Sequence, residues 1–106
     1  MSYRQAISLL PDFAEAHSNL GITLQAQGRL EEAKASYARA IELRTDFAEA
    51  HSNLGATLQA LGELEDSEAR LAQAIELKPD YAEAHYNLGV TLQAQARLEE
   101  SEMSYR

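Results

Sequence analysis

The 106-residue sequence contains no cysteine, no tryptophan and only two prolines, and no run of apolar residues approaches the length of a membrane span. Without cysteine the chain can form neither a disulfide nor a thiolate metal site, and it has no cysteine nucleophile. A membrane-spanning helix needs about 20 consecutive apolar residues, so none is expected. The N-terminus also lacks the apolar core of a secretory signal peptide. We therefore expect a soluble protein located in the cytoplasm.

Basic residues and aromatic residues are scarce as well. Nine lysines and arginines stand against 17 aspartates and glutamates, which gives a formal net charge of −8. Nucleic acids and acidic membrane surfaces are bound mainly through clustered cations, so this composition disfavours both as partners. The five tyrosines and two phenylalanines are the only aromatic residues. We expect a thin core that is shared along an array of repeats.

A ten-residue stretch occurs three times, at a fixed spacing of 34 residues. Segments 12–21 and 46–55 are identical (DFAEAHSNLG), and segment 80–89 (DYAEAHYNLG) differs from them at two positions. A fixed period of this length indicates one supersecondary unit stacked on copies of itself. The sequence therefore predicts one repeat array in a single domain.

Each unit carries the signals of two helices. In the first unit we expect helices over about residues 14–27 and 30–43, because apolar and small residues recur there at helical spacing. In the second unit the first helix is expected to begin at residue 48, and the second to cover about residues 63–77. The chain shows no strand signal. The predicted fold is all-α, a helical hairpin repeated along the chain.

The expected helix ends follow from capping residues. An aspartate precedes each first helix and a glutamate follows three residues later, as in a capping box; the aspartates are Asp12, Asp46 and Asp80. Gly28 and Gly62 are expected to end the first helices, because the left-handed conformation at a helix C-terminus favours glycine. In the third unit Ala96 stands at this position, where that conformation costs roughly 1 kcal/mol. We expect an adjusted turn there.

The period divides the chain at regular points. Residues 1–10 match the second half of a second helix, and residues 11–44 and 45–78 form two complete repeats. Residues 79–106 form a third repeat, which stops within its second helix. This division suggests a piece excised from a longer array.

The pattern resembles the tetratricopeptide repeat, a helical hairpin of 34 residues. The positions that define that pattern are held in the first repeat by His17, Leu20, Gly21, Leu24, Ala33, Tyr37 and Ala40. The sequence departs from it with histidine at the usual tryptophan position and with Thr45 at the usual proline position. Within the family, the sequence of these repeats is most similar to the repeats of O-linked N-acetylglucosamine transferases and their bacterial relatives. The resemblance implies a right-handed superhelical solenoid that serves as a protein–protein interaction scaffold.

Three rows of polar side chains are expected on the concave wall, which in this family is built from the first helix of each repeat. An asparagine side chain offers a donor and an acceptor together, so a row of them can pair with the backbone of an extended peptide. The transferase-like repeats are thought to hold peptide in this way. Duplication of the repeat, or hydrogen bonds within the hairpin, would explain the asparagines equally well. The candidate peptide-binding residues are Asn19, Asn53, Asn87, Glu15, Glu49, Glu83, Ser18, Ser52, Tyr86, Gln25, Gln59 and Gln93.

The other two rows have simpler explanations beside binding. Capping and the helix dipole account for the glutamates alone; if the glutamates also touch ligand, the partner is a neutral to basic protein or peptide. Solvated helix surface accounts for the glutamines. Some family members bind the acidic C-termini of chaperones through lysine and arginine on this wall. Here the corresponding positions are Glu, Ser, Asn and Ile, so no such clamp is expected.

Residues with catalytic or metal-binding chemistry are not arranged for it. His17, His51 and His85 stand one per repeat, without a histidine four residues away and without cysteine, so packing at the edge of the core is favoured over metal binding. Paired acids at the start of each second helix match the helix dipole. No phosphate loop or nucleophile motif occurs. We expect no cofactor and no enzymatic activity.

Apolar side chains are expected to be bare at both ends of the array, because neither end carries a polar capping helix. These surfaces are complementary, which predicts a head-to-tail homo-oligomer; a monomer with frayed ends is the alternative. The candidate self-association residues are Tyr3, Ile7, Leu10, Leu88, Leu92, Leu98 and Tyr105. Three functional hypotheses follow: a peptide-binding scaffold, a self-assembling structural module, and the substrate-recruiting part of a larger glycosyltransferase.

Overall fold

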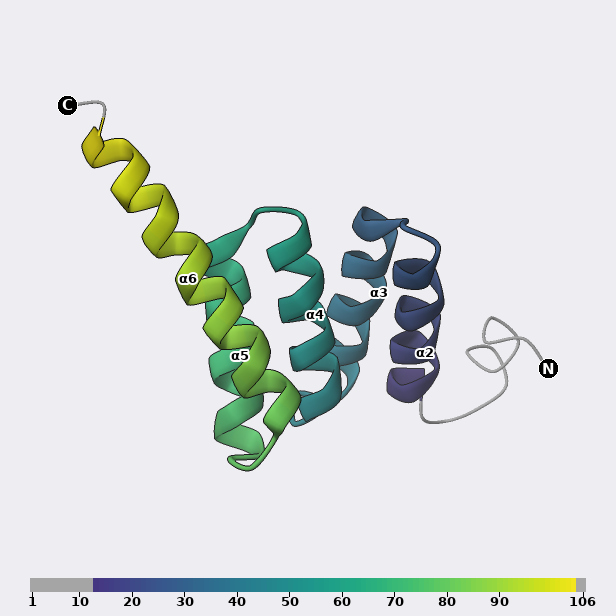
Figure 1. The fold of residues 1–106 in the computed structure, drawn as a ribbon. Coiled ribbons are helices and arrows are strands. Elements are labelled where there is room, and N and C mark those ends of the chain that lie inside the picture. Colours follow the sequence, from purple (N-terminus) through teal and green to yellow (C-terminus); the bar gives the residue numbers. More distant parts are fainter. Residues whose placement is uncertain (1–12, 105–106) are drawn as a thin grey trace.

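The computed structural model describes residues 13–104, and their side chains as far as residue 100 (Figure 1). This part of the chain is an array of helices without strands, as the sequence predicts. The candidate residues Tyr3, Ile7, Leu10 and Tyr105, and the half helix expected at residues 1–10, lie outside the described residues. The helices are α2 (Phe13–Ala26), α3 (Leu30–Leu43), α4 (Ala48–Ala60), α5 (Leu64–Leu77) and α6 (Ala82–Ser104).

The helices pack as successive antiparallel pairs. Helices α2 and α3 form one hairpin and α4 and α5 form the next, while α3 contacts α4 and α5 contacts α6. The first helices of the repeats also touch one another, since α2 contacts α4 and α4 contacts α6. These three helices therefore form one wall of the solenoid. The solenoid as a whole measures 56 × 28 × 19 Å.

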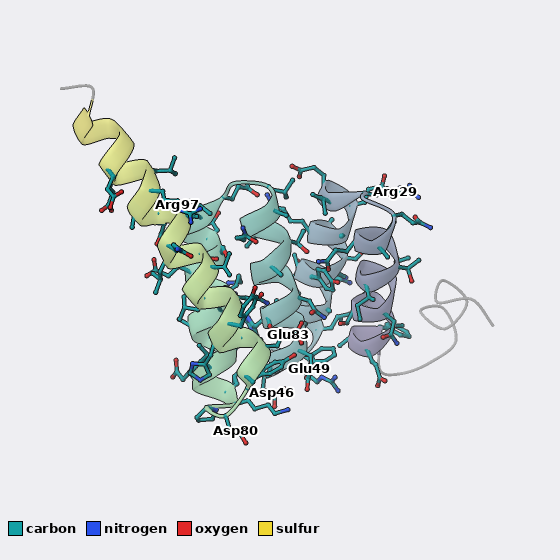
Figure 2. The ribbon with its side chains drawn as sticks, viewed as in Figure 1. Arg29, Asp46, Glu49, Asp80, Glu83 and Arg97 are labelled. Atoms are coloured by element: carbon teal, nitrogen blue, oxygen red, sulfur yellow. The ribbon has the colours of Figure 1, made fainter. Side chains whose placement is uncertain are left out.

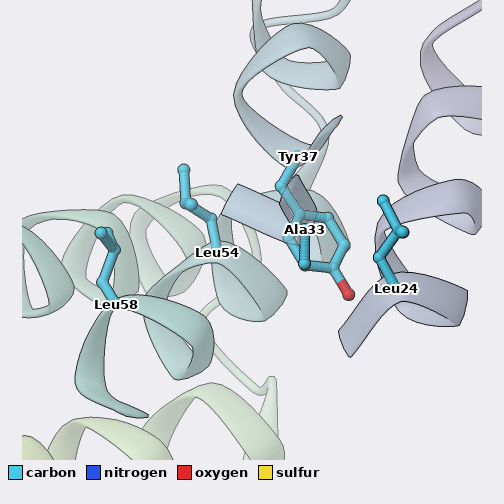
Figure 3. Packing of buried hydrophobic residues seen from close by; sticks show 5 residues of the cluster. All are labelled: Leu24, Ala33, Tyr37, Leu54 and Leu58. Atoms are coloured by element: carbon cyan, nitrogen blue, oxygen red, sulfur yellow. The ribbon is translucent and has the colours of Figure 1, made fainter. Parts of the chain in front are cut away.

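The core consists of small clusters shared between neighbouring hairpins. One cluster joins α2, α3 and α4, and its residues are Leu24, Ala33, Tyr37, Leu54 and Leu58 (Figure 3). The second joins α5 to α6 through Leu71, Ala74 and Ala84. Alanines at the contacts let the helix backbones approach closely, so a few large side chains fill the space between them.

Glycine ends α2 and α4, as predicted. Gly28 and Gly62 have φ angles of 78° and 82°, and no other described residue has a positive φ. In the first turn the Arg29 N–H donates to the Leu24 carbonyl at 2.9 Å, and the Gly28 N–H donates to the Gln25 carbonyl at 3.0 Å. This is the Schellman arrangement, which satisfies the last carbonyls of the helix.

The predicted cap of α4 is wrong. Phe47, not Asp46, is the residue that precedes the helix, and no side chain caps it. The Phe47 N–H instead donates to the Arg44 carbonyl at 3.3 Å, and the Phe47 carbonyl accepts from His51 N–H at 3.1 Å. Because of this turn, the residue that precedes the helix is Phe47, one position after the aspartate.

The predicted turn near Ala96 is also wrong. Helix α6 continues through Ala96 to Ser104, and its second half projects beyond the body of the molecule (Figure 1). A left-handed turn residue is disfavoured for alanine by about 1–2 kcal/mol. Gln95, Ala96 and Arg97 are all good helix formers, so continuation of the helix is locally preferred. No described helix is both long enough and apolar enough to cross a membrane.

Candidate functional site

A groove of about 540 Å³ runs over the wall formed by the first helices. We call it the wall groove. It brings together six of the predicted peptide-binding residues: Glu15, Ser18, Asn19, Glu49, Asn53 and Glu83. The remaining lining comes from Ile22 of α2, from Arg44 and Phe47 between α3 and α4, and from Tyr81, which precedes α6.

The asparagine side chains hold the same register in α2, α4 and α6. All three are partly buried, and Asn19 and Asn53 lie in the wall groove whereas Asn87 does not. Within the described part of the chain, no hydrogen bond is made by any of the three side-chain amides. Thr23 and Thr57 donate to the backbone carbonyls of Asn19 and Asn53, at 3.2 and 2.9 Å. Bonding within the hairpin therefore does not explain these amides, while duplication of the repeat still could.

The predicted binding residues at the register of Ser18, which are Ser18, Ser52 and Tyr86, depart from expectation. Ser18 is nearly buried at the edge of the groove, and Ser52 is fully buried, so Ser52 cannot contact a peptide. The Ser52 hydroxyl has no hydrogen-bond partner in the described part of the chain, although it influences the pKa of nearby Tyr81. Tyr86, at the same register in α6, is 71% exposed and lies outside the groove.

The glutamine row lies outside the wall groove. The Gln25 side-chain oxygen accepts a hydrogen bond from the Tyr37 hydroxyl at 2.7 Å, which ties it to its own hairpin. Leu71 replaces this tyrosine in the second repeat, so Gln59 has no equivalent donor. Gln93 is exposed on α6.

Sequence reasoning missed the aromatic part of the groove. Phe47 and Tyr81 are its ring side chains, and a cation lies over each ring. The Arg44 guanidinium is 4.0 Å from the centre of the Phe47 ring, and Lys78 Nζ is 4.9 Å from that of Tyr81. The signal was present in the sequence, because an aromatic residue follows the aspartate in every copy of the ten-residue stretch.

The groove carries negative charge. Glu15, Glu49 and Glu83 are all exposed, and Figure 2 shows Glu49 and Glu83 near each other at the lower middle of the molecule. Burial raises the pKa of Tyr81, and the charges of Glu83 and Glu49 raise it further, against a smaller opposite effect of the Ser52 hydroxyl. The Tyr81 phenol therefore stays protonated at neutral pH and can donate a hydrogen bond.

The histidines have structural environments. His51 is buried, and its Nε2–H donates to the Thr45 carbonyl at 3.0 Å, so the predicted packing role is confirmed for it. His85 makes the same bond to the Pro79 carbonyl at 2.8 Å but is exposed. Burial lowers the pKa of His51; the hydrogen bond to the Thr45 carbonyl opposes this effect, and nearby Arg70 adds to it. Among the described residues, no cluster of three or more acidic or histidine side chains could hold a metal ion.

Comparisons with known proteins agree on the fold. A family model described as the TPR repeat matches residues 2–28, 24–62 and 60–95. A search of curated proteins found no match.

Three solved structures are similar to the chain. The first TPR of Spaghetti (RPAP3), bound to an HSP90 peptide SRMEEVD, is 24% identical with a TM-score of 0.84, over 89% of this chain and 75% of that chain. MamA is 27% identical with a TM-score of 0.82, over 97% of this chain and 60% of that chain. A mutant O-GlcNAc transferase of Thermobaculum terrenum is 36% identical with a TM-score of 0.80, over 85% of this chain and only 17% of that chain.

Proposed function

This chain belongs to the tetratricopeptide repeat family, and on that premise we propose that it is a non-catalytic interaction scaffold that binds an extended peptide in the wall groove. The observation that carries the proposal is the pair of amides of Asn19 and Asn53. They stand at the same register of neighbouring helices, line one groove, and make no hydrogen bond within the described chain. A peptide backbone laid across α2 and α4 offers each amide a carbonyl and an N–H.

The charge of the groove selects the class of peptide. Three exposed glutamates line it, one from each repeat. Among the described residues that line it, Arg44 is the one cation and stacks on Phe47, while Lys78 lies next to the groove, 3.9 Å from Glu49. A peptide of neutral to basic charge is therefore favoured. The acidic peptide named for the RPAP3 structure is not the expected ligand here, because the wall carries Glu, Ser, Asn and Ile where an acidic terminus would need cations.

The apolar lining supplies a second kind of contact. Ile22 is 48% exposed, and Phe47 and Tyr81 are partly buried in the same groove. Peptide side chains that point toward the wall can bury apolar surface on these three residues, while the backbone pairs with the amides. We propose that the amides hold the chain and that the aromatic lining selects its side chains.

A binding measurement with matched variants tests the proposal. Peptides would be selected from a displayed random library and titrated calorimetrically into the full chain. Each amide that is removed loses at least one hydrogen bond worth about 0.5–1.5 kcal/mol, so Asn19→Ala with Asn53→Ala should weaken binding by at least about fivefold. Asn87→Ala is the matched control, since Asn87 has the same register but lies outside the groove, and it should change affinity less than threefold. Unchanged affinity in the double variant would rule out the amide pair as the docking element.

The charge preference needs a separate experiment. A lysine-containing peptide from the selection is compared with SRMEEVD at the same ionic strength. We expect the first to bind and the second not to bind, and Glu15→Gln with Glu49→Gln should weaken only the basic peptide. Tight binding of SRMEEVD would contradict the proposed selectivity.

A second candidate function rests on the transferase likeness. The 36% identity to a transferase region covering 17% of that chain is compatible with a substrate-recruiting segment of a larger enzyme. In that case the peptide in the groove would be the enzyme's protein substrate. The full coding sequence decides between the two, because this candidate requires a glycosyltransferase domain in the same polypeptide.

A further inference from the structure

In the third repeat, the surface on which a second helix would pack is not covered by any described residue. We call this surface around Gly89 the seat. In the first two repeats, a large side chain of the second helix lies against a glycine of the first. A Cβ atom added at Gly21 would be 2.6 Å from the Tyr37 ring, and one added at Gly55 would be 2.5 Å from Leu71. At Gly89, the equivalent position in α6, no described atom lies within 4 Å of such a Cβ.

The third repeat also borders an open notch, which is lined by apolar side chains and by the acidic residues Glu65, Asp66, Glu68 and Glu99. The notch has a volume of about 840 Å³ and lies between α5 and the second half of α6. We call it the α5–α6 notch. Leu64, Ala69, Ala72 and Leu98 form its apolar lining. Leu98 is 59% exposed and Leu92 is 46% exposed, whereas the residues equivalent to Leu92, Leu24 and Leu58, are 5% and 4% exposed.

The chain's own residues 97–105 match the missing helix. They repeat the pattern of residues 29–37 and 63–71, with Leu98 at the register of Leu30 and Leu64. Tyr105 holds the register of Tyr37 and Leu71. The side chain that would lie against Gly89 is therefore encoded in the same sequence.

One potential ion pair also links this segment to the notch. Between the first two repeats, Lys34 Nζ binds both carboxylate oxygens of Glu63, at 2.9 and 3.0 Å. One repeat later the equivalent positions are Glu68 and Arg97, so the two charges are exchanged but remain opposite. Glu68 lines the notch. A second helix seated there would place Arg97 beside it.

Leu98 and Glu99 line one side of the notch, but the segment cannot fold back over Gly89 of its own chain while α6 is continuous. Ala96 takes the place of the two glycines that turn with positive φ, and it is part of the helix instead. The second half of α6 points away from the body (Figure 1). A second copy can supply the segment without any break in α6.

We propose that two copies of this chain exchange the second halves of their α6 helices, each half packing into the partner's α5–α6 notch. The exchange is reciprocal, so it closes at two copies. Arg29 lies midway in sequence between Gly21 and Tyr37, which pack together. In the third repeat Arg97 lies midway between Gly89 and Tyr105 in the same way. The two α6 helices therefore lie antiparallel, with the two-fold axis near Arg97. The wall groove stays free, since it lies over α2, α4 and the start of α6.

Mass measurement across a concentration series tests whether the assembly stops at two copies. Sedimentation of the full chain should give a species of about twice the 11.7 kDa chain mass, with no growth beyond it as concentration rises. A monomer at every concentration up to the millimolar range overturns the proposal. Continued growth beyond two copies also overturns it, in favour of the head-to-tail assembly expected from the sequence.

A glycine substitution at the turn position distinguishes a dimer formed by helix exchange from other kinds of dimer. Ala96→Gly restores the turn residue of the first two repeats, so the hairpin can close within one chain and the dimer should dissociate at least tenfold more readily. Ala94→Gly is the matched control, because it is the same substitution two residues away in the same helix, at a position whose equivalents Ala26 and Ala60 are exposed. If both variants, or neither, lose the dimer, the turn is not what drives exchange and the proposal fails.

Two further variants probe the seat and the ion pair. Gly89→Gln fills the glycine position with a good helix former, and it should abolish the dimer while helical content by circular dichroism is retained. Glu68→Lys and Arg97→Glu should each weaken the dimer, and the double variant should recover most of the loss. A dimer indifferent to Gly89→Gln, or single charge changes without rescue, would overturn the assignment of the notch.

Discussion

The Ser67 hydroxyl of α5 lies 2.9 Å from the Thr91 hydroxyl of α6, and both side chains are fully buried. The Ser67 hydroxyl also donates to the Gly55 carbonyl at 2.7 Å. A hydroxyl has one proton to donate, so Thr91 must be the donor in the pair. One buried chain of hydrogen bonds thus links α4, α5 and α6 and joins the second repeat to the third.

Ser67→Ala should destabilise the fold by only about 1 kcal/mol. The first repeat already shows the outcome: Ala33 takes the place of Ser67 there, and the Thr57 hydroxyl donates to the Asn53 carbonyl instead. Thr91 can turn to the Asn87 carbonyl in the same way, so no buried donor is left unpaired. Urea denaturation gives the difference in free energy of unfolding. A loss above about 3 kcal/mol would mean that Thr91 cannot turn.

The glycines of the first helices should differ sharply in their tolerance of alanine. Gly21→Ala forces a Cβ against the Tyr37 ring, and overpacking of this kind costs about 1–3 kcal/mol. Gly89→Ala meets no described atom and replaces a poor helix former, so it should stabilise by about 0.5–1 kcal/mol. Thermal and urea unfolding at a concentration where the chain is monomeric compares the two. Equal effects at both positions would contradict the described packing.

Acidification should destabilise the fold partly through His51. Burial lowers the pKa of His51 in the folded chain below the ordinary value of 6.5, so the unfolded chain binds the proton first as pH falls. The stabilisation is therefore complete above about pH 6.5 and is lost as pH falls through the depressed pKa. Burial also lowers the pKa of His17, with a contribution from Arg39, so His17 acts in the same direction.

His51→Gln tests this assignment. The glutamine amide can still donate to the Thr45 carbonyl but does not titrate, so the variant should lose less stability than the parent between pH 7.5 and pH 5. His85→Gln is the control, because His85 makes the equivalent bond from an exposed position. Identical pH profiles for His51→Gln and the parent would show that other groups carry the acid sensitivity.

The sequence predicts most of the fold because its signals are local and repeated. The 34-residue period, the helical spacing of apolar residues and Gly28 and Gly62 each determine a boundary within a few neighbouring residues. The prediction of a third hairpin is wrong because a single residue decides whether the chain turns there or continues as a helix. Ala96 tips the balance between a turn and a continuous helix, and the family pattern describes only the turn.

The site was less predictable, because it depends on contacts between repeats. The register along one helix correctly brings Asn19 and Asn53 to one wall. It does not show that Ser52 is buried, or that the Tyr37 hydroxyl reaches Gln25. Tyr81 enters the groove from a loop, which helical angles alone cannot place.

Nuclear magnetic resonance of the asparagine side chains tests the wall groove most directly as the docking site. The uniformly ¹⁵N-labelled chain would be titrated with a selected neutral or basic peptide, and the side-chain NH₂ signals followed. We predict that the signals of Asn19 and Asn53 shift together and saturate at the calorimetric stoichiometry. Shifts confined to α3 and α5, with both asparagine signals unchanged, would contradict peptide binding in the wall groove.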